Sequence, residues 1–126
     1  MSDAPDLIAA RGIDAATVPL DVVGPKPGAF AGDPVESALV VHEDARLEIG
    51  VWACTPGSFP SVKDGISEVM HVVAGEATIV GEDGALHELG PGSLLVTPDG
   101  WRGTWHVRQT VRKTYVIWKT DARGET

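Results

Sequence analysis

Apolar and polar residues alternate most clearly between Arg46 and Cys54. The apolar residues Leu47, Ile49, Val51 and Ala53 fall on one side of this segment. The intervening residues Glu48, Gly50, Trp52 and Cys54 fall on the other. A period of two predicts a half-buried antiparallel strand, and the turn residues Thr55-Pro56-Gly57 end it.

Other short apolar segments are separated by turn residues in the same way. They predict strands over residues 15–23, 37–42, 66–73, 77–80, 85–89, 93–97, 101–107 and 111–118. Asp83-Gly84 predicts a hairpin turn, and the proline- and glycine-rich segment 24–28 predicts a loop. Short strands at roughly ten-residue spacing are typical of a sandwich or a small barrel.

Composition supports one turn-rich domain. The chain has 126 residues, and its 15 glycines and 9 prolines exceed average usage, which disfavours long helices. With 43% hydrophobic and 22% charged residues, the chain is not of the disordered class. The single cysteine, Cys54, excludes an intrachain disulfide and a multi-cysteine zinc site.

The charge excludes a further class of protein. A formal charge of −8 repels phosphate backbones, so we expect no nucleic-acid partner. Residues 1–99 carry 4 basic and 16 acidic side chains, whereas residues 100–126 carry 6 basic and 2 acidic ones. The basic residues either form an anion-attracting rim or pair with the acidic remainder. The first residues lack a basic signal-peptide start and no apolar run approaches ~20 residues, so we expect a cytoplasmic protein without a membrane partner.

Several segments between Gly50 and Trp118 resemble the cupin family in order and spacing. Glu68 and Gly75 keep the spacing E-x6-G of its first motif, and Gly92, Pro98 and Gly100 keep the spacing G-x5-P-x-G of its second. The chain looks like the small single-domain cupins of the ureidoglycine-aminohydrolase-like group, formerly of unknown function.

The resemblance implies an all-β fold, a small cupin barrel of two antiparallel sheets in jelly-roll order. Residues 1–45 would form an N-terminal arm and edge strands, residues 46–120 the barrel core, and residues 121–126 a C-terminal tail. Such barrels commonly pair through an edge sheet, so a homodimer is also implied.

The metal ligands of that family are largely missing. The H-x-H position falls among residues 61–64, and the second-motif histidine and asparagine positions are Gly103 and Val107. Only Glu68 of four ligands remains, and one carboxylate cannot hold a transition metal tightly. We therefore predict no metal ligands and no cofactor; the other candidate donors are His71, His106 and Asp64.

Glu68 is the first candidate for chemistry. Alternation places it on one face with Met70, and the resemblance places the motif glutamate inside the barrel. A buried carboxylate must be paired, hydrogen-bonded or protonated. It serves either as an acid, base or ligand-orienting acceptor, or as the partner of an inward cation such as Lys63 or an arginine.

We predict a ligand-binding set of Trp52, Glu68, Met70, Trp105 and Tyr115. Trp105 points inward if Gly103 keeps the inward position of the family's histidine. Indole rings either stack a planar or sugar-like ligand or fill the core. For Cys54 the alternatives are a nucleophile and a small buried hydrophobe.

Three functions remain open from the sequence. The first is metal-independent binding of a small organic molecule, including an anion, in the barrel. The second is an enzyme of the ureide or amide hydrolase or isomerase kind, in which Glu68 with Tyr115 or Lys63 forms a catalytic acid–base pair. The third is a non-catalytic sensor or partner-binding scaffold.

Overall fold

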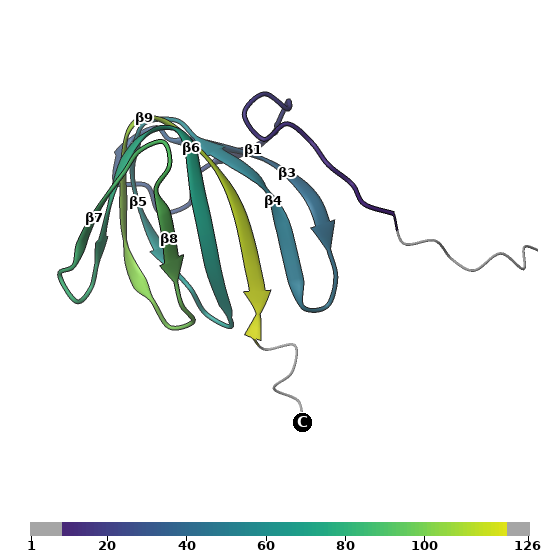
Figure 1. Ribbon diagram of the computed structural model, residues 1–126. Helices are drawn as coiled ribbons and strands as arrows, with labels where there is room; N and C mark the ends of the chain where they lie inside the picture. The colour runs from purple at the N-terminus through teal and green to yellow at the C-terminus, as the bar shows by residue number, and fades with distance from the viewer. Residues whose placement is uncertain (1–8, 121–126) are drawn as a thin grey trace, which may run out of the picture.

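The structure is a computed structural model that describes residues 9–120, so the predicted tail and the first residues of the predicted arm lie outside it. The described residues form nine β-strands (Figure 1). These are β1 (Asp21–Pro25), β2 (Ala31–Gly32), β3 (Val35–Glu43), β4 (Leu47–Cys54), β5 (Gly57–Val62), β6 (Ile66–Gly81), β7 (Leu86–Leu89), β8 (Leu94–Thr97) and β9 (Arg102–Lys119). Residues 9–120 contain no helix that could span a membrane.

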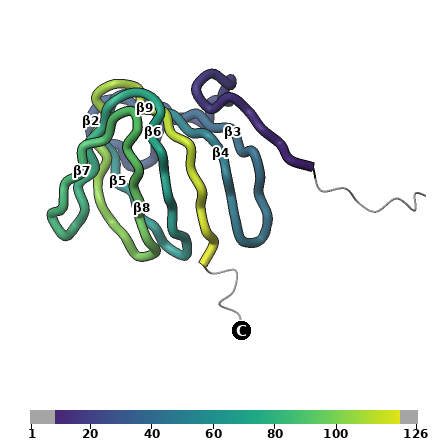
Figure 2. The backbone as a smooth tube through the Cα atoms, in the orientation of Figure 1, coloured from purple at the N-terminus to yellow at the C-terminus, as the bar shows by residue number. Residues whose placement is uncertain are grey.

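Two long antiparallel strands, β6 and β9, organise the fold. The first half of β6 and the second half of β9 lie in a sheet ordered β1-β3-β4-β9-β6-β8. The other halves lie in a sheet ordered β2-β5-β9-β6-β7. Both strands therefore run from one sheet into the other. Figure 2 shows the backbone bending where they cross between the sheets. The predicted all-β fold of two antiparallel sheets is confirmed.

The long strands correct two predicted breaks. The predicted strands 66–73 and 77–80 are one strand, and so are 101–107 and 111–118. The pairing of β6 with β9 shifts register between Val72 and Ala77, as expected where bulges bend a strand without ending it. Gly75 lies in this bend with φ +87°, and its Cα faces the backbone of Thr110 and Val111 too closely for a side chain.

The predicted strand 15–23 overlaps β1 only at residues 21–23, and the sequence pattern predicted neither β2 nor β5. Pro25 belongs to β1 rather than to a loop, which is tolerated because β1 is an edge strand paired only with β3. In β5, Ser58 accepts a hydrogen bond from Phe30 on the side away from β9. By alternation Pro60 also presents its backbone to that side, so its missing N–H costs no bond to β9.

The core fills the space between the two sheets. Its buried side chains come from β4 to β7 and from β9: Cys54, Phe59, Met70, Val72, Ala77, Ile79, Leu89, Trp105, Val107 and Val111. The segment before β1 is tied to β9 because the Arg112 guanidinium donates to the carbonyl oxygens of Ala15 (2.8 Å) and Val18 (2.5 Å).

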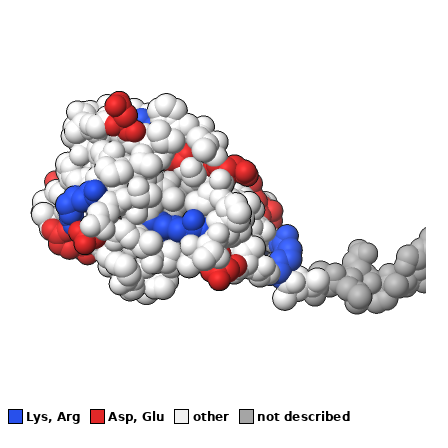
Figure 3. Space-filling model, turned by 90° about the horizontal axis from the view of Figure 1, so that it is seen from above, with Lys and Arg blue, Asp and Glu red and all other residues white. Residues whose placement is uncertain are grey.

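The basic residues of β9 are mostly paired within the molecule. Arg108 contacts Glu88 at 3.0 Å and Lys119 contacts Glu43 at 2.7 Å. Figure 3 shows separate basic and acidic spots on the face it presents, with no continuous patch of one sign. Of the two interpretations of the basic C-terminal residues, pairing with acidic residues therefore fits Arg108 and Lys119. Lys113 lies in the interior.

Candidate functional site

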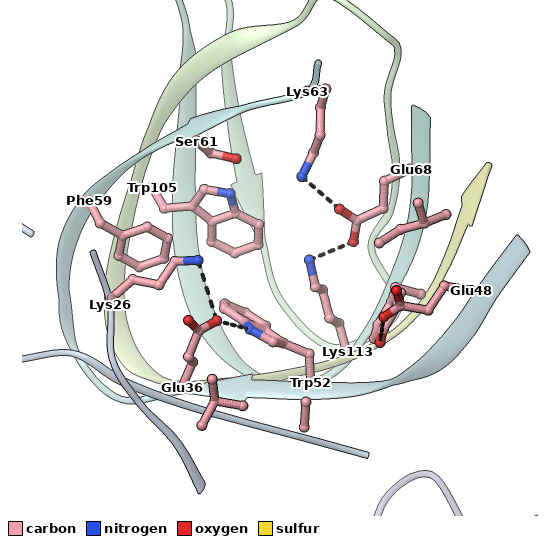
Figure 4. Close-up of a pocket in the computed structure, with 14 residues that line it drawn as sticks. Lys26, Glu36, Glu48, Trp52, Phe59, Ser61, Lys63, Glu68, Trp105 and Lys113 are labelled. Atoms are coloured by element: carbon pink, nitrogen blue, oxygen red, sulfur yellow. Dashed lines mark hydrogen bonds and ion pairs between the residues drawn. The ribbon is translucent and has the colours of Figure 1, made fainter. Parts of the chain in front are cut away.

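A cavity of about 270 Å³ lies inside the barrel (Figure 4). Strands β1, β3, β4, β5, β6 and β9 and the segments that follow β1 and β5 contribute to its wall. The lining residues are Val23, Lys26, Glu36, Ala38, Glu48, Trp52, Phe59, Ser61, Lys63, Glu68, Trp105, Lys113, Tyr115 and Ile117. Charged and aromatic side chains therefore line the same cavity.

Glu68 holds two lysines with one carboxylate. Its Oε1 lies 2.8 Å from Lys63 Nζ, and its Oε2 lies 2.7 Å from Lys113 Nζ. The Glu68 side chain is 4% exposed and that of Lys113 is 7% exposed. When all three are ionised, these groups carry one negative and two positive charges in a place that is largely shielded from water.

Two indole rings flank Lys113. Its Nζ lies 4.6 Å from the Trp52 ring centroid and 4.9 Å from that of Trp105. The rings meet edge-to-face at 5.5 Å, and Phe59 stacks on Trp105 at 6.0 Å. Ring faces carry negative potential, so they stabilise the ammonium where water is excluded.

The cluster shifts the pKa of both partners. Burial alone would raise the pKa of Glu68, but the charges and hydrogen bonds of Lys113 and Lys63 outweigh it, so that pKa lies below its usual value. Burial lowers the pKa of Lys113, and the attraction of Glu68 only partly offsets this. Glu68 therefore stays ionised. Lys113 loses its proton more readily in the barrel than it would in water.

Two further carboxylates line the cavity. Glu36 accepts a hydrogen bond from the Trp52 indole N–H at 2.9 Å and pairs with Lys26 at 3.4 Å. Glu48 accepts a hydrogen bond from the Tyr115 hydroxyl at 2.7 Å. Burial and this hydrogen bond raise the pKa of Tyr115, so its proton stays on the phenol.

The structure brings most of the predicted site residues together. Trp52, Lys63, Glu68, Trp105 and Tyr115 all line the cavity. Met70 differs: it is 1% exposed in the core and is not among the lining residues, although its Sδ lies 3.9 Å from Lys113 Nζ.

The sequence interpretation missed Lys113, Lys26, Glu36 and Glu48. A signal existed for Lys113, because Tyr115 was expected to point inward and residues two apart on a strand share a face. The same alternation placed Glu48 beside Trp52 on β4. Lys26 follows edge strand β1, and its position depends on how that strand pairs with β3.

The residues around Glu68 do not fit a metal ion. Lysine ammoniums occupy both carboxylate oxygens, and a protonated amine is not a metal ligand. At the family's histidine position, Gly103 has the ring of Trp101 against its Cα. Within residues 9–120, no group of three or more histidine, cysteine, aspartate or glutamate residues could hold a metal.

The other candidate donors lie away from the cavity. His71 and Asp64 are exposed, and the His106 ring bonds to the Ser58 hydroxyl at 2.8 Å. Cys54 is buried at 1% exposure, and burial raises its pKa to about 11. Cys54 therefore behaves as a small core hydrophobe rather than as an activated nucleophile.

Solved structures of similar fold exist. The Clostridium difficile EutQ protein is 22% identical, with a TM-score of 0.61 over 70% of this chain and 71% of that one. The cupin domain of Schizosaccharomyces pombe Cnp3 is 11% identical, with a TM-score of 0.67 over 90% of this chain and 77% of that one. These two likenesses show the fold.

A further relative has no known function. It is a DUF861-family protein from Pseudomonas syringae, 25% identical, with a TM-score of 0.73 over 83% of this chain. The chain spans 46% of that protein's length. No functionally curated protein matches the chain.

A family model places the chain more closely. The model of the EutQ-like cupin domain matches residues 41–115, which is more than half of the chain. The match covers β4 to β8 whole, the end of β3 and most of β9, including Glu68 and Lys113. The chain therefore belongs to the family of EutQ-like cupin domains.

Proposed function

We propose that the barrel cavity binds a small organic anion without a metal, through the ammonium groups of Lys63 and Lys113. The observation that carries this proposal is that the two lysines share the single carboxylate of Glu68. With both lysines protonated, one positive charge is left over beside a carboxylate whose side chain is 4% exposed. A carboxylate or similar anion of a ligand would neutralise it, at a place where water screens charge weakly.

The surrounding residues support an organic ligand rather than a bare ion. Trp52 and Phe59 give the wall apolar area, and a cavity of about 270 Å³ has room for several non-hydrogen atoms beside the lysines. Glu68 would orient the two ammoniums toward the anion. Its role is then that of a positioning residue, held charged by its partners.

The enzymatic alternative has less support. In the predicted acid–base pairs, Glu48 holds the Tyr115 proton and both oxygens of the Glu68 carboxylate are engaged by lysines. Ureide or amide hydrolysis in the resembled group is metal-supported, and the donors at this site do not fit a metal. The scaffold alternative leaves the charged lining of the cavity without a role.

The test is a titration with matched probes. Benzoate carries the anion, and benzamide has the same shape without the charge. We expect benzoate to raise the melting temperature of the protein in a concentration-dependent way, and benzamide to have little effect, because only benzoate can neutralise the lysines. Equal effects of the two, or none from either, would contradict the proposal.

A lysine elsewhere in the same cavity gives the control variant. Lys113→Met should abolish stabilisation by benzoate. Lys26→Met should leave most of it, because Lys26 already has Glu36 as its own carboxylate partner. An equal loss in both variants would point to diffuse charge attraction instead of a built site.

A further inference from the structure

The charges of the cavity balance in number but not in position. Three lysines and three glutamates line it. Lys26 and Glu36 form one pair, whereas Glu68 has two lysines. Glu48 is left as the carboxylate without a cation: among residues 9–120, no nitrogen of a basic side chain lies within 4.0 Å of it.

Glu48 is held in place as an acceptor. The hydroxyl of Tyr115 donates to its Oε2 at 2.7 Å, which fixes the carboxylate against the cavity wall. A neutral hydroxyl satisfies one acceptor position and leaves the charge uncompensated. Glu48 also contributes to raising the pKa of Tyr115, because a phenolate beside a carboxylate is disfavoured.

The two imbalances have opposite signs and line one cavity. Glu48 lies on β4, and Lys113 and Tyr115 lie on the neighbouring strand β9. Glu48 pairs with Ile117 of β9, and all four residues line the cavity. An anion alone would neutralise the lysines but would add repulsion toward Glu48. A ligand with a charge of each sign would neutralise both places at once.

We propose, as an extension of the anion site above, that the ligand is a small zwitterion. Its carboxylate binds Lys63 and Lys113, and its ammonium group binds Glu48. This assigns Glu48 as a specificity-determining residue that selects amino acids over simple acids of the same length. The flanking side chains Trp52 and Ile117 would contact the carbon chain between the two charges.

Two matched series of probes test this inference. The first is glycine, 3-aminopropanoate, 4-aminobutanoate and 5-aminopentanoate. The second is acetate, propanoate, butanoate and pentanoate, which lack only the amine. Dissociation constants for wild-type protein are measured by calorimetry or by NMR titration at constant ionic strength. The length series is needed because the separation of the two charges must match that of Glu48 and the lysines.

We expect one amino acid to bind about tenfold or more tighter than the acid of the same chain length. Glu48→Gln should remove that advantage and leave the binding of the simple acid unchanged or tighter. Glu76→Gln removes a surface carboxylate that contacts Arg108 at 3.8 Å, and this control should keep the preference. The amide oxygen that Glu48→Gln introduces can still accept from Tyr115, so the variant should fold.

The outcomes separate this inference from the anion site. If each acid binds as tightly as its amino acid in wild-type protein, the role of Glu48 is overturned while the anion site stands. If no member of either series binds although benzoate does, this inference is overturned while the anion site stands; if benzoate also fails to bind, both are overturned. A preference that survives Glu48→Gln would also contradict the inference. The wild-type comparison alone is decisive if the variant does not fold.

Discussion

Lys113 and Glu68 form an ion pair of 2.7 Å inside the barrel, between strands β9 and β6. Lys63 contacts the second oxygen of the same carboxylate at 2.8 Å, so the pair is one part of a three-member cluster. Both lysines depend on this carboxylate, but the carboxylate would keep a partner if either lysine were lost. The stability and the binding behaviour of the domain follow from this asymmetry.

Replacing the shared carboxylate should destabilise the fold. Glu68→Gln leaves two lysines in the barrel without a counter-charge, and breaking a buried pair in this way costs about 3–5 kcal/mol. Urea unfolding followed by tryptophan fluorescence gives the free energy of unfolding. Glu76→Gln on the surface should change it by less than about 1 kcal/mol. A loss of similar size in both variants would contradict the buried role of Glu68.

Removing one lysine should abolish anion binding with little loss of stability. In Lys113→Met, Glu68 keeps Lys63 as its partner, and the new methionine side chain fills the space between the two indole rings. Burial lowers the pKa of Lys113, so the native barrel disfavours its proton relative to the unfolded chain. We therefore expect the free energy of unfolding to stay within about 1 kcal/mol of wild type or to increase, while anion binding is lost. A large loss of stability would show that Lys113 is structural.

The Glu68 cluster should also shape the response to acid. The pKa of Glu68 in the native protein lies below its ordinary value of about 4.3, so the carboxylate stabilises the fold fully above that pH. This contribution is lost as the pH falls through the native pKa. The difference in unfolding free energy between wild type and Glu68→Gln should therefore be constant from pH 7 to about pH 5 and shrink below about pH 4. A difference that grows toward acid pH would have the wrong sign.

Cys54 gives an independent test of the core. Burial raises its pKa to about 11, compared with about 8.5 for a free thiol. At pH 8 its thiolate fraction falls by about two orders of magnitude, and its 1% exposure limits access further. We expect an aromatic disulfide reagent to react with the native protein at least that much more slowly than with the urea-unfolded chain. Rapid reaction of the native thiol would contradict this packing.

Much of the barrel could be predicted because period-two alternation is a local property. The alternation at Arg46–Cys54 and the turn residues between apolar segments led to the correct fold class. The continuity of β6 through Gly75 could not be predicted, since a glycine in a bulge and a glycine in a turn look alike in sequence. Strand β5 was missed for a similar reason. A proline such as Pro60 is tolerated in a strand only where its backbone faces away from the paired neighbour, and the sequence does not show which side that is.

Part of the site, Glu68 and Lys63, could be predicted from the sequence. The motif spacing led to Glu68, and Lys63 was named as its partner, a pairing that the structure confirms at 2.8 Å. Lys113 followed from the same alternation as Tyr115, but lysine is usually a surface residue and its inward position was not predicted. That Glu68 serves two lysines, and Glu48 none within residues 9–120, depends on the register of β4, β6 and β9 and is not visible in the sequence.

The most direct test of the anion site is a crystal structure with 4-bromobenzoate, whose bromine can be located by anomalous scattering. We predict one bromine peak inside the barrel, with the carboxylate within hydrogen-bonding distance of Lys63 and Lys113, and no such peak in Lys113→Met crystals. Bromine found only on the outer surface, or inside the barrel with its carboxylate turned away from both lysines, would contradict the account.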